Sequence, residues 1–498
     1  MASKIFMGNM PELMERILNN LNKEIHSLHS CALVSRHWCE MSIPIIWRNP
    51  FSFQVFKPMF ISTYISSYED LDDDVKSILK KYGIIINFQQ NSLFHYVRFL
   101  EVLSLSLLNY GVDHWISIHL HDEDQNIEKI KYHVANLLLK IFIKDGVTLS
   151  ELGLDSLNNF IEINSEIFFA LFDSDYLPQL CHELASIIKS QEHLEYFNFT
   201  CKLNTQSWEL YGIILALKGQ KDALKVITLD HCNYSSEFEV LRDCENLDVI
   251  RIFYCSNEIF NKFNSKISIL EINTTGLYNA SGLIQILEKS GSSLQRFKLN
   301  DENRYFNDED DEDDEDSYSL FNFNRKGYLI RSQRLLLETL MTSCPNIVHL
   351  HILGVVKYST HILKLISSLQ KLKFLTIGWD DEFDESKPEE KEKMEVLVKQ
   401  LAEILPPTLQ YLNLSKKYLG LRINNLLEHC NAPLEKLLFW MPAHNEDETI
   451  NAIIRFCVRK KTLNIVGVNG FKVDWEKIEK DLERYVKVVS YCSFAVSV

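Results

Sequence analysis

The sequence predicts an α/β protein in which a small all-α module of three short helices precedes an irregular solenoid of repeated strand–helix units. Three observations lead to this fold class. Apolar residues recur at helical spacing in the first fifty residues, a six-residue apolar pattern then recurs twelve times, and helical patterns separate its copies. The chain has 498 residues, of which 46% are hydrophobic, so it can bury a large core.

The first predicted helix covers residues 11 to 21. At 100° per residue, its apolar side chains fall within an arc of about 140°, and its charged side chains fall outside that arc. The apolar residues on this face are Leu13, Met14, Ile17, Leu18 and Leu21. Pro11 stands in the first turn, where its missing N–H has no helical partner to lose.

Two further helices are predicted before residue 51. The second runs from Leu28 to Cys39 with most of its apolar residues on one face, and Leu33 stands alone on the polar side. Ser42 can cap the third, which has Pro44 near its start. Three short helices in fewer than 45 residues form a poor independent core, so the module is expected to need a partner.

The residues of this module resemble the F-box. The similarity lies in MPELMERILNNL, residues 10–21, followed by LHSCALVSRHWCEMSIPIIWRNPF, residues 28–51, with its Val-Ser-Arg-x-Trp segment. This resemblance implies binding to the Skp-type adaptor of SCF ubiquitin ligases and, through it, to cullin and RING subunits. The residues it assigns to adaptor binding are Met10, Pro11, Leu13, Met14, Ile17 and Leu18. Those it assigns to the F-box core are Leu21, Leu28, Val34, Trp38 and Trp47. The alternative is a helical cap on the rest of the chain, in which Trp38 and Trp47 are ordinary core aromatics.

The remainder of the chain carries twelve copies of an LxxLxL pattern with apolar substitutions. The copies begin at Leu100, Leu149, Leu194, Leu224, Leu247, Ile267, Leu294, Ile347, Leu372, Leu409, Leu434 and Leu463. From Leu194 onward most spacings are 20 to 37 residues, which is the range of leucine-rich repeats. We therefore expect an irregular leucine-rich-repeat solenoid, a horseshoe with a parallel sheet on its concave face. Before Leu194 the spacings are 49 and 45 residues, so the number of repeats there stays open.

An F-box followed by such repeats is similar to the F-box/leucine-rich-repeat class, in which the repeats hold a protein substrate. The expected domains are the F-box at 8–50, a helical linker at 51–95 with a charged helix at 68–83, and the leucine-rich-repeat domain at 96–498. Nine consecutive acidic residues, 308–316, predict a disordered insertion over 301–318. That run is either a solvated insertion or a site for a basic protein partner.

Candidate substrate-binding residues follow from the alternation of side chains along a strand. If the leucines of LxxLxL face the core, positions three, five and seven face the open concave side. The residues that this rule selects as substrate-binding candidates are Arg251, Phe253, Arg296, Lys298, His349, His351, Phe374, Tyr411, Lys436 and Trp440. It also places Glu271, Asn273, Thr376 and Asn413 on this face. Aromatic and arginine side chains dominate binding hot spots, although ordinary sheet surface is an equally open interpretation. His349 and His351 have no predicted third ligand, so no metal is expected.

Composition and missing motifs limit the remaining functions. The net charge of −16 argues against nucleic acid or an anionic membrane as partner, and no run reaches about 18 apolar residues. Eleven cysteines without a CxxC pair suggest free thiols, and the first residues lack a secretory pattern, so a cytoplasmic or nuclear location is expected. Nucleotide-binding, zinc-protease and nucleophile-elbow motifs are absent, so no catalytic residue and no cofactor are expected.

Three functions remain after these exclusions. The first is a non-catalytic substrate-recognition adaptor of an SCF-type ubiquitin ligase. The second is a leucine-rich-repeat scaffold that acts outside ubiquitin transfer and binds a basic partner through the acidic run. The third is a hydrolase, for which the sequence offers no nucleophile and base in a recognisable order.

Overall fold

The computed structural model describes two compact units, Met1–Asn246 and Leu247–Val498. The description covers residues 11–490 except for 54–56, 67–79, 81–83, 85–92, 120–126, 156–175, 202–211, 277–278, 303–317, 356–358, 380–387, 415–421, 442–445 and 471–474. The acidic run 308–316 and, except for Lys80, the predicted charged helix 68–83 therefore lie outside the described residues.

Three helices occupy residues 11–48, which we call the N-terminal module. They are α2 (Pro11–Asn19), α3 (Ile25–Ala32) and α4 (Arg36–Arg48). The first begins at Pro11 as predicted. The predicted helix from Leu28 to Cys39 is interrupted between α3 and α4. Ser35 is the N-cap of α4, and its hydroxyl accepts a hydrogen bond of 3.3 Å from the N–H of Trp38. The predicted start at Ser42 is wrong for the same reason: α4 has already begun, and Ser42 is a buried residue inside it.

The end of α4 packs into the core of the first unit. Trp47 is 4% exposed and its ring contacts Phe60 at 4.7 Å, Tyr64 at 5.1 Å and Tyr96 at 4.3 Å between centroids. Those rings come from α5 (Lys57–Ser66) and the 3₁₀ helix η2 (Tyr96–Phe99). The chain itself therefore supplies part of the core that three short helices lack.

The first unit continues as alternating helices and parallel strands. Its strands are β1 (Val102–Ser104), β2 (Glu151–Leu154), β3 (Tyr196–Thr200) and β4 (Val226–Asp230), and they pair in chain order. Its further helices are α7 (Leu105–His119), α8 (Ile127–Lys144), α10 (Tyr176–Ser190) and α11 (Ile213–Ala216), followed by the 3₁₀ helices η3 (Leu217–Gln220) and η4 (Ser236–Asp243). The two motif copies before Leu194 thus each contribute a strand, as the pattern predicts.

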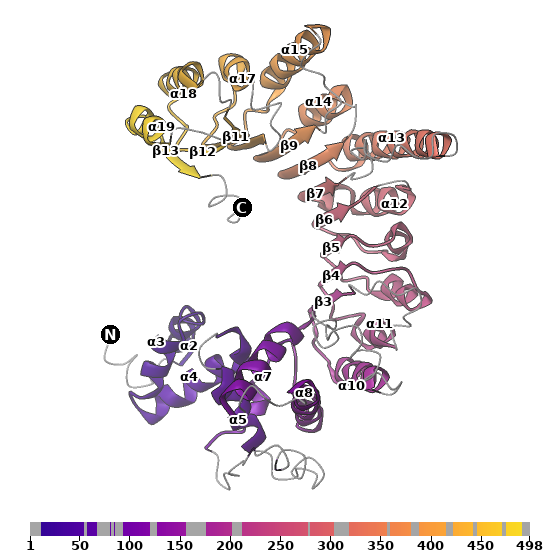
Figure 1. Cartoon of the computed structure of the whole chain (residues 1–498), viewed down its shortest axis with the longest axis vertical. Coiled ribbons are helices and arrows are strands. Elements are labelled where there is room, and N and C mark those ends of the chain that lie inside the picture. The colour runs from indigo at the N-terminus through magenta and orange to yellow at the C-terminus, as the bar shows by residue number, and fades with distance from the viewer. Residues whose placement is uncertain are drawn as a thin grey trace. The chain divides into compact units, whose positions relative to one another are not determined.

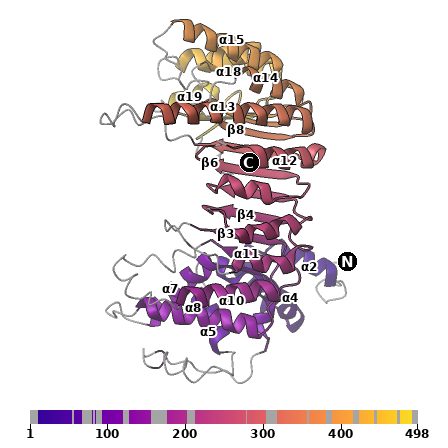
Figure 2. The same cartoon turned by 90° about the vertical axis from the view of Figure 1, so that its right-hand side faces the viewer.

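The described residues of the second unit form nine parallel strands, again paired in chain order. They are β5 (Val249–Phe253), β6 (Ile269–Thr274), β7 (Arg296–Asp301), β8 (His349–Val355), β9 (Phe374–Trp379), β10 (Tyr411–Leu414), β11 (Lys436–Trp440), β12 (Ile465–Asn469) and β13 (Lys487–Ser490). Between them lie η5 (Asn257–Lys262), α12 (Ser281–Ser290), α13 (Tyr318–Ser343), α14 (Ser359–Ser368), α15 (Pro388–Ile404), α17 (Ile423–His429), α18 (Glu446–Lys460) and α19 (Trp475–Leu482). These helices cover one face of the sheet, and no described helix covers the other (Figure 1, Figure 2). The predicted α/β solenoid with a parallel sheet is confirmed.

The register of the strands explains why the repeats stack. Leu350 on β8 pairs with Phe297 on β7 and Leu375 on β9, and all three are at most 1% exposed. Each repeat thus buries its apolar residues against the neighbouring repeats. The sequence pattern missed β13, because Tyr485 stands where the other copies have a leucine or isoleucine. Val488 nevertheless pairs with Val466.

A buried polar contact holds the ends of β7 and β8. Gln333 on α13 is 0% exposed, and its amide donates to Asp301 Oδ2 at 3.1 Å and to the carbonyl of Gly354 at 3.3 Å. Gly354 has φ 77°, and a Cβ placed on it would lie 1.8 Å from the carbonyl oxygen of Asp301. The predicted insertion includes Asp301, which instead ends β7 and is 1% exposed.

Candidate interaction surfaces

Helix α2 turns one part of its apolar face inward and the other outward. Met14 and Leu18 are 1% and 0% exposed, so they hold the helix in the N-terminal module. Leu13 and Ile17 are 38% and 44% exposed. Of the six residues assigned to adaptor binding, Met14 and Leu18 are therefore buried, and only Leu13 and Ile17 are described as exposed. Met10 and the side chain of Pro11 lie outside the described residues.

The connection between α3 and α4 exposes two more apolar side chains. Leu33 is 75% exposed and Val34 is 63% exposed, because both stand between the end of α3 and the cap of α4. Sequence reasoning placed Val34 in the core and did not select Leu33. The available signal was the isolated position of Leu33 on the polar side of the predicted helix. Among the other expected core residues, Leu28 is fully buried like Trp47, and Leu21 and Trp38 are half-buried.

A second candidate surface is the helix-free face of the sheet in the second unit, which we call the sheet face. Strand register brings its predicted residues into two rows. The first row runs Arg296, His349, Phe374 and Tyr411, and the second runs Lys298, His351, Thr376 and Asn413. Residues that lie far apart in the sequence are thus neighbours across β7 to β10.

The β5–β7 part of the sheet face carries a short chain of ion pairs. Glu271 accepts a hydrogen bond from Arg251 Nε at 3.1 Å and forms an ion pair with Arg296, whose Nε lies 2.9 Å from Glu271 Oε1. The side chain of Glu271 is 12% exposed. One carboxylate thus neutralises and orients two guanidinium groups. Lys298 lies next to Glu271 in register, and its side chain makes no hydrogen bond or ion pair within the described part of the chain. The face therefore keeps an excess of positive charge.

The two histidines of β8 are neutral near pH 7. Burial is the main cause: it lowers the pKa of His349 to about 4 and the pKa of His351 to about 3. The cations of Arg296 and Lys298 lower both values further. Within the described residues, Nε2 of His351 is buried without a hydrogen-bond partner, and no group of three metal-binding side chains is found.

An aromatic row adjoins these cations. The ring of His349 stacks on Phe374 with 5.3 Å between centroids and 23° between planes, and Phe374 lies 6.1 Å from Tyr411. Tyr411 is only 3% exposed, and Asn413, which donates to the Tyr411 hydroxyl at 3.4 Å, is 6% exposed. The open part of the row therefore ends near Phe374.

The sheet face is more apolar at β11 and β12. Leu438 is 0% exposed although its position faces away from the helices, because its register partner is Gly467. A Cβ on Gly467 would lie 2.8 Å from Leu438 Cγ, so the leucine occupies that space. The remaining candidates, Phe253, Lys436 and Trp440, are half-buried.

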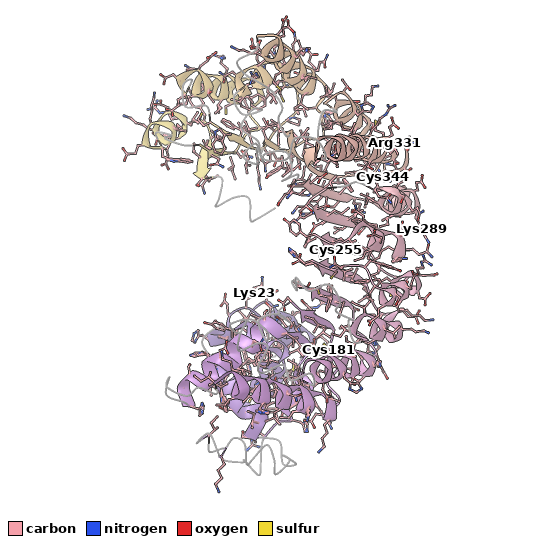
Figure 3. All side chains as sticks on the ribbon, turned by 45° about the vertical axis from the view of Figure 1, so that its right-hand side comes forward. Lys23, Cys181, Cys255, Lys289, Arg331 and Cys344 are labelled. Carbon is pink, nitrogen blue, oxygen red and sulfur yellow. The ribbon has the colours of Figure 1, made fainter. Side chains whose placement is uncertain are left out.

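The described cysteines do not form a reactive site. All ten are free thiols, and seven of them are buried. Burial raises the pKa of Cys181 on α10, and of Cys344 after α13, to about 12, so both are thiols near pH 7 (Figure 3). Cys255 follows β5, and its thiol donates to the carbonyl of Phe253 at 3.3 Å.

Comparison with models of known protein families gives no match, and no curated protein sequence matches the chain significantly. The resemblance to the F-box therefore rests on the residues of the N-terminal module themselves. In the part of the chain that the structure describes, no helix is both long and apolar enough to cross a membrane.

Proposed function

We propose that this protein is the substrate-recognition subunit of an SCF-type ubiquitin ligase. In this proposal the N-terminal module binds a Skp-type adaptor, and the leucine-rich repeats bind a protein substrate. The chain itself performs no chemistry, and it works in the cytoplasm or the nucleus.

The observation that carries the proposal is the exposure of four large apolar side chains in a module whose sequence resembles the F-box. Leu13 and Ile17 on α2, and Leu33 and Val34 before α4, are between 38% and 75% exposed. Fully burying an exposed side chain of this size contributes about 1.5–3 kcal/mol, and each of these four contributes the fraction that is still exposed. A partner that covers all four can therefore bind tightly. Met14 and Leu18 belong to the interior, and their part is to hold α2 in position.

The proposed mechanism is proximity. The adaptor connects the N-terminal module to cullin and RING subunits, which hold the ubiquitin-charged enzyme, and the repeats hold the substrate. Both reactants then belong to one complex, so ubiquitin transfer gains effective concentration without a catalytic group from this chain.

The test is co-purification of the full chain with a Skp-type adaptor and cullin. We expect Leu13→Asp combined with Ile17→Asp to weaken adaptor recovery at least about tenfold, because the contact would have to bury two carboxylates. The matched control is Leu335→Asp combined with Val458→Asp, which changes residues of 42% and 58% exposure in the second unit.

Equal recovery of both double variants would contradict the proposed surface. A wild-type chain that never recovers cullin would contradict the proposed function itself and would favour a scaffold outside ubiquitin transfer. Leu18→Ala provides a separate check, because it removes a buried side chain. It should lower the free energy of unfolding by about 2–5 kcal/mol.

A further inference from the structure

Strand β7 presents the cation of Lys298 beside a stacked pair of rings on the sheet face. Lys298 on β7 is half-buried and makes no ion pair within the described residues, whereas Arg251 and Arg296 share Glu271. His351 is its register partner on β8, and the stacked rings of His349 and Phe374 lie in the adjacent row. A cation and an aromatic surface are thus presented side by side.

We propose that the sheet face around Lys298, Arg296, His349 and Phe374 binds an acidic segment of a partner protein that also carries an aromatic side chain. A carboxylate of the segment pairs with the Lys298 ammonium, and the aromatic ring packs on Phe374 and His349. This inference deepens the proposed function, because it names the class of substrate that the repeats would hold. Calling the bound segment a substrate rests on the proposed function.

Charge complementarity favours this occupant. The whole chain carries a net charge of −16, so an acidic protein is repelled by most of its surface. The sheet face from β5 to β8 has the opposite sign of charge, because it carries three cations, Arg251, Arg296 and Lys298. The described carboxylates beside them are Glu271 and Glu302, which accepts a hydrogen bond from Asn300 at the end of β7. An acidic segment is therefore attracted at this place and repelled elsewhere, which fixes where it binds. Three cations offer little to a polyphosphate such as nucleic acid, which is bound through many phosphate contacts.

Strand spacing sets the arrangement of the segment. Lys298 lies on β7 and Phe374 on β9, two strands apart and two residues apart along the strand direction. Neighbouring strands lie about 4.8 Å apart and residues along a strand about 3.3 Å apart, so the two positions are separated by about 12 Å. An extended chain covers that distance in about three to four residues. The bound segment should thus place an acidic and an aromatic residue about three positions apart.

Fluorescence anisotropy with the purified full chain tests this inference without an adaptor, so it succeeds or fails independently of the proposed function. The probe is a fluorescein-labelled octapeptide with a glutamate three positions before a phenylalanine. The comparison peptides replace that glutamate by glutamine, or move it next to the phenylalanine. We expect each comparison peptide to bind about three- to tenfold more weakly.

Two charge-changing variants should shift the affinity for the probe in opposite directions. Lys298→Glu should weaken the probe about tenfold or more, and Glu271→Gln, which frees two arginines and keeps the side-chain shape, should strengthen it about threefold. Lys289→Glu is the matched control: it makes the same charge change on the outer side of α12, where Lys289 donates to Asn264 (Figure 3). Thermal unfolding of each variant verifies folding.

Two results would overturn the inference. The first is equal binding of the glutamate and glutamine peptides, or equal loss in Lys298→Glu and Lys289→Glu. The second concerns the acidic run 308–316 of this chain as the alternative occupant. If the probe binds only after these nine residues are replaced by asparagine and glutamine, the sheet face belongs to the chain's own segment and not to a partner.

Discussion

The N-terminal module and the sheet face of the second unit expose different kinds of side chain. The module leaves Leu13, Ile17, Leu33 and Val34 in solvent, whereas the sheet face combines Lys298 with arginines and the stacked pair of His349 and Phe374. Apolar contacts suit a lasting subunit interface, and charged and aromatic contacts suit a reversible and selective one. The difference suggests that one chain uses two surfaces for two kinds of association.

The difference between the two surfaces can be tested by a substitution that damages one surface and leaves the other intact. Gly354→Ala should do so, because its Cβ would lie 1.8 Å from the Asp301 carbonyl and the φ of 77° disfavours a side chain. We expect a loss of about 3 kcal/mol or more in the free energy of unfolding of the second unit. Hydrogen exchange should increase in β7 and β8, and binding of the acidic probe should fall.

Gly146→Ala is the control for this prediction. Gly146 has φ 62°, but nothing lies within 4 Å of an added Cβ, so the cost should be only about 1 kcal/mol. The proposed adaptor interaction should survive in both variants. An equal cost for the two alanines would show that the close approach to Asp301 adds nothing to the backbone strain.

A second prediction uses pH to separate the surfaces. The pKa values of His349 and His351 lie at about 4 and about 3 in the folded chain, below the value of an exposed histidine. The unfolded chain then binds more protons below pH 6.5, so the folded chain loses stability as the pH falls from about 6.5 toward 4. Each imidazole should contribute a loss of about 2 kcal/mol between pH 7 and pH 5.

The measurement is urea unfolding of the wild type and of His349→Asn combined with His351→Asn at pH 7 and pH 5. The wild type should lose about 4 kcal/mol more than the double variant over this range. His26 and His29 of the N-terminal module are exposed, so replacing both by asparagine is the matched control. Parallel pH profiles for the wild type and the β8 variant would contradict the burial of these imidazoles.

The two surfaces also differ in how much of them the sequence could predict. The LxxLxL pattern predicted twelve strands and the rows of the sheet face, because a period of two fixes which side chain faces the helices. Burial within those rows depends on neighbouring strands, and a single strand cannot reveal it. Tyr411 and Leu438 lie on the predicted face yet are buried, and Leu438 is buried because Gly467 stands beside it.

In the N-terminal module, the sequence could not predict which apolar side chains of one helix face are buried. Helical periodicity found the apolar residues of α2, but it could not separate Met14 and Leu18, which pack inward, from Leu13 and Ile17, which do not. All of them share one arc, and the choice depends on where α4 lies. The break before α4 depends on a single hydroxyl contact from Ser35, which outweighed a continuous helical pattern from Leu28 to Cys39.

The smallest predicted effect, and the one that sharpens the comparison most directly, is that of salt. The Debye length falls from about 14 Å at 50 mM to about 4 Å at 500 mM NaCl, so the attraction of a half-buried Lys298 for a carboxylate is largely screened. Over this range we expect the acidic probe to bind about five- to tenfold more weakly. Recovery of the Skp-type adaptor should change less than about twofold, because salt does not weaken the burial of Leu13, Ile17, Leu33 and Val34. Parallel anisotropy and co-purification series at the same salt concentrations measure both. An adaptor complex as salt-sensitive as the probe would mean that charged residues carry the first interface too, and the distinction between the two surfaces would then fail.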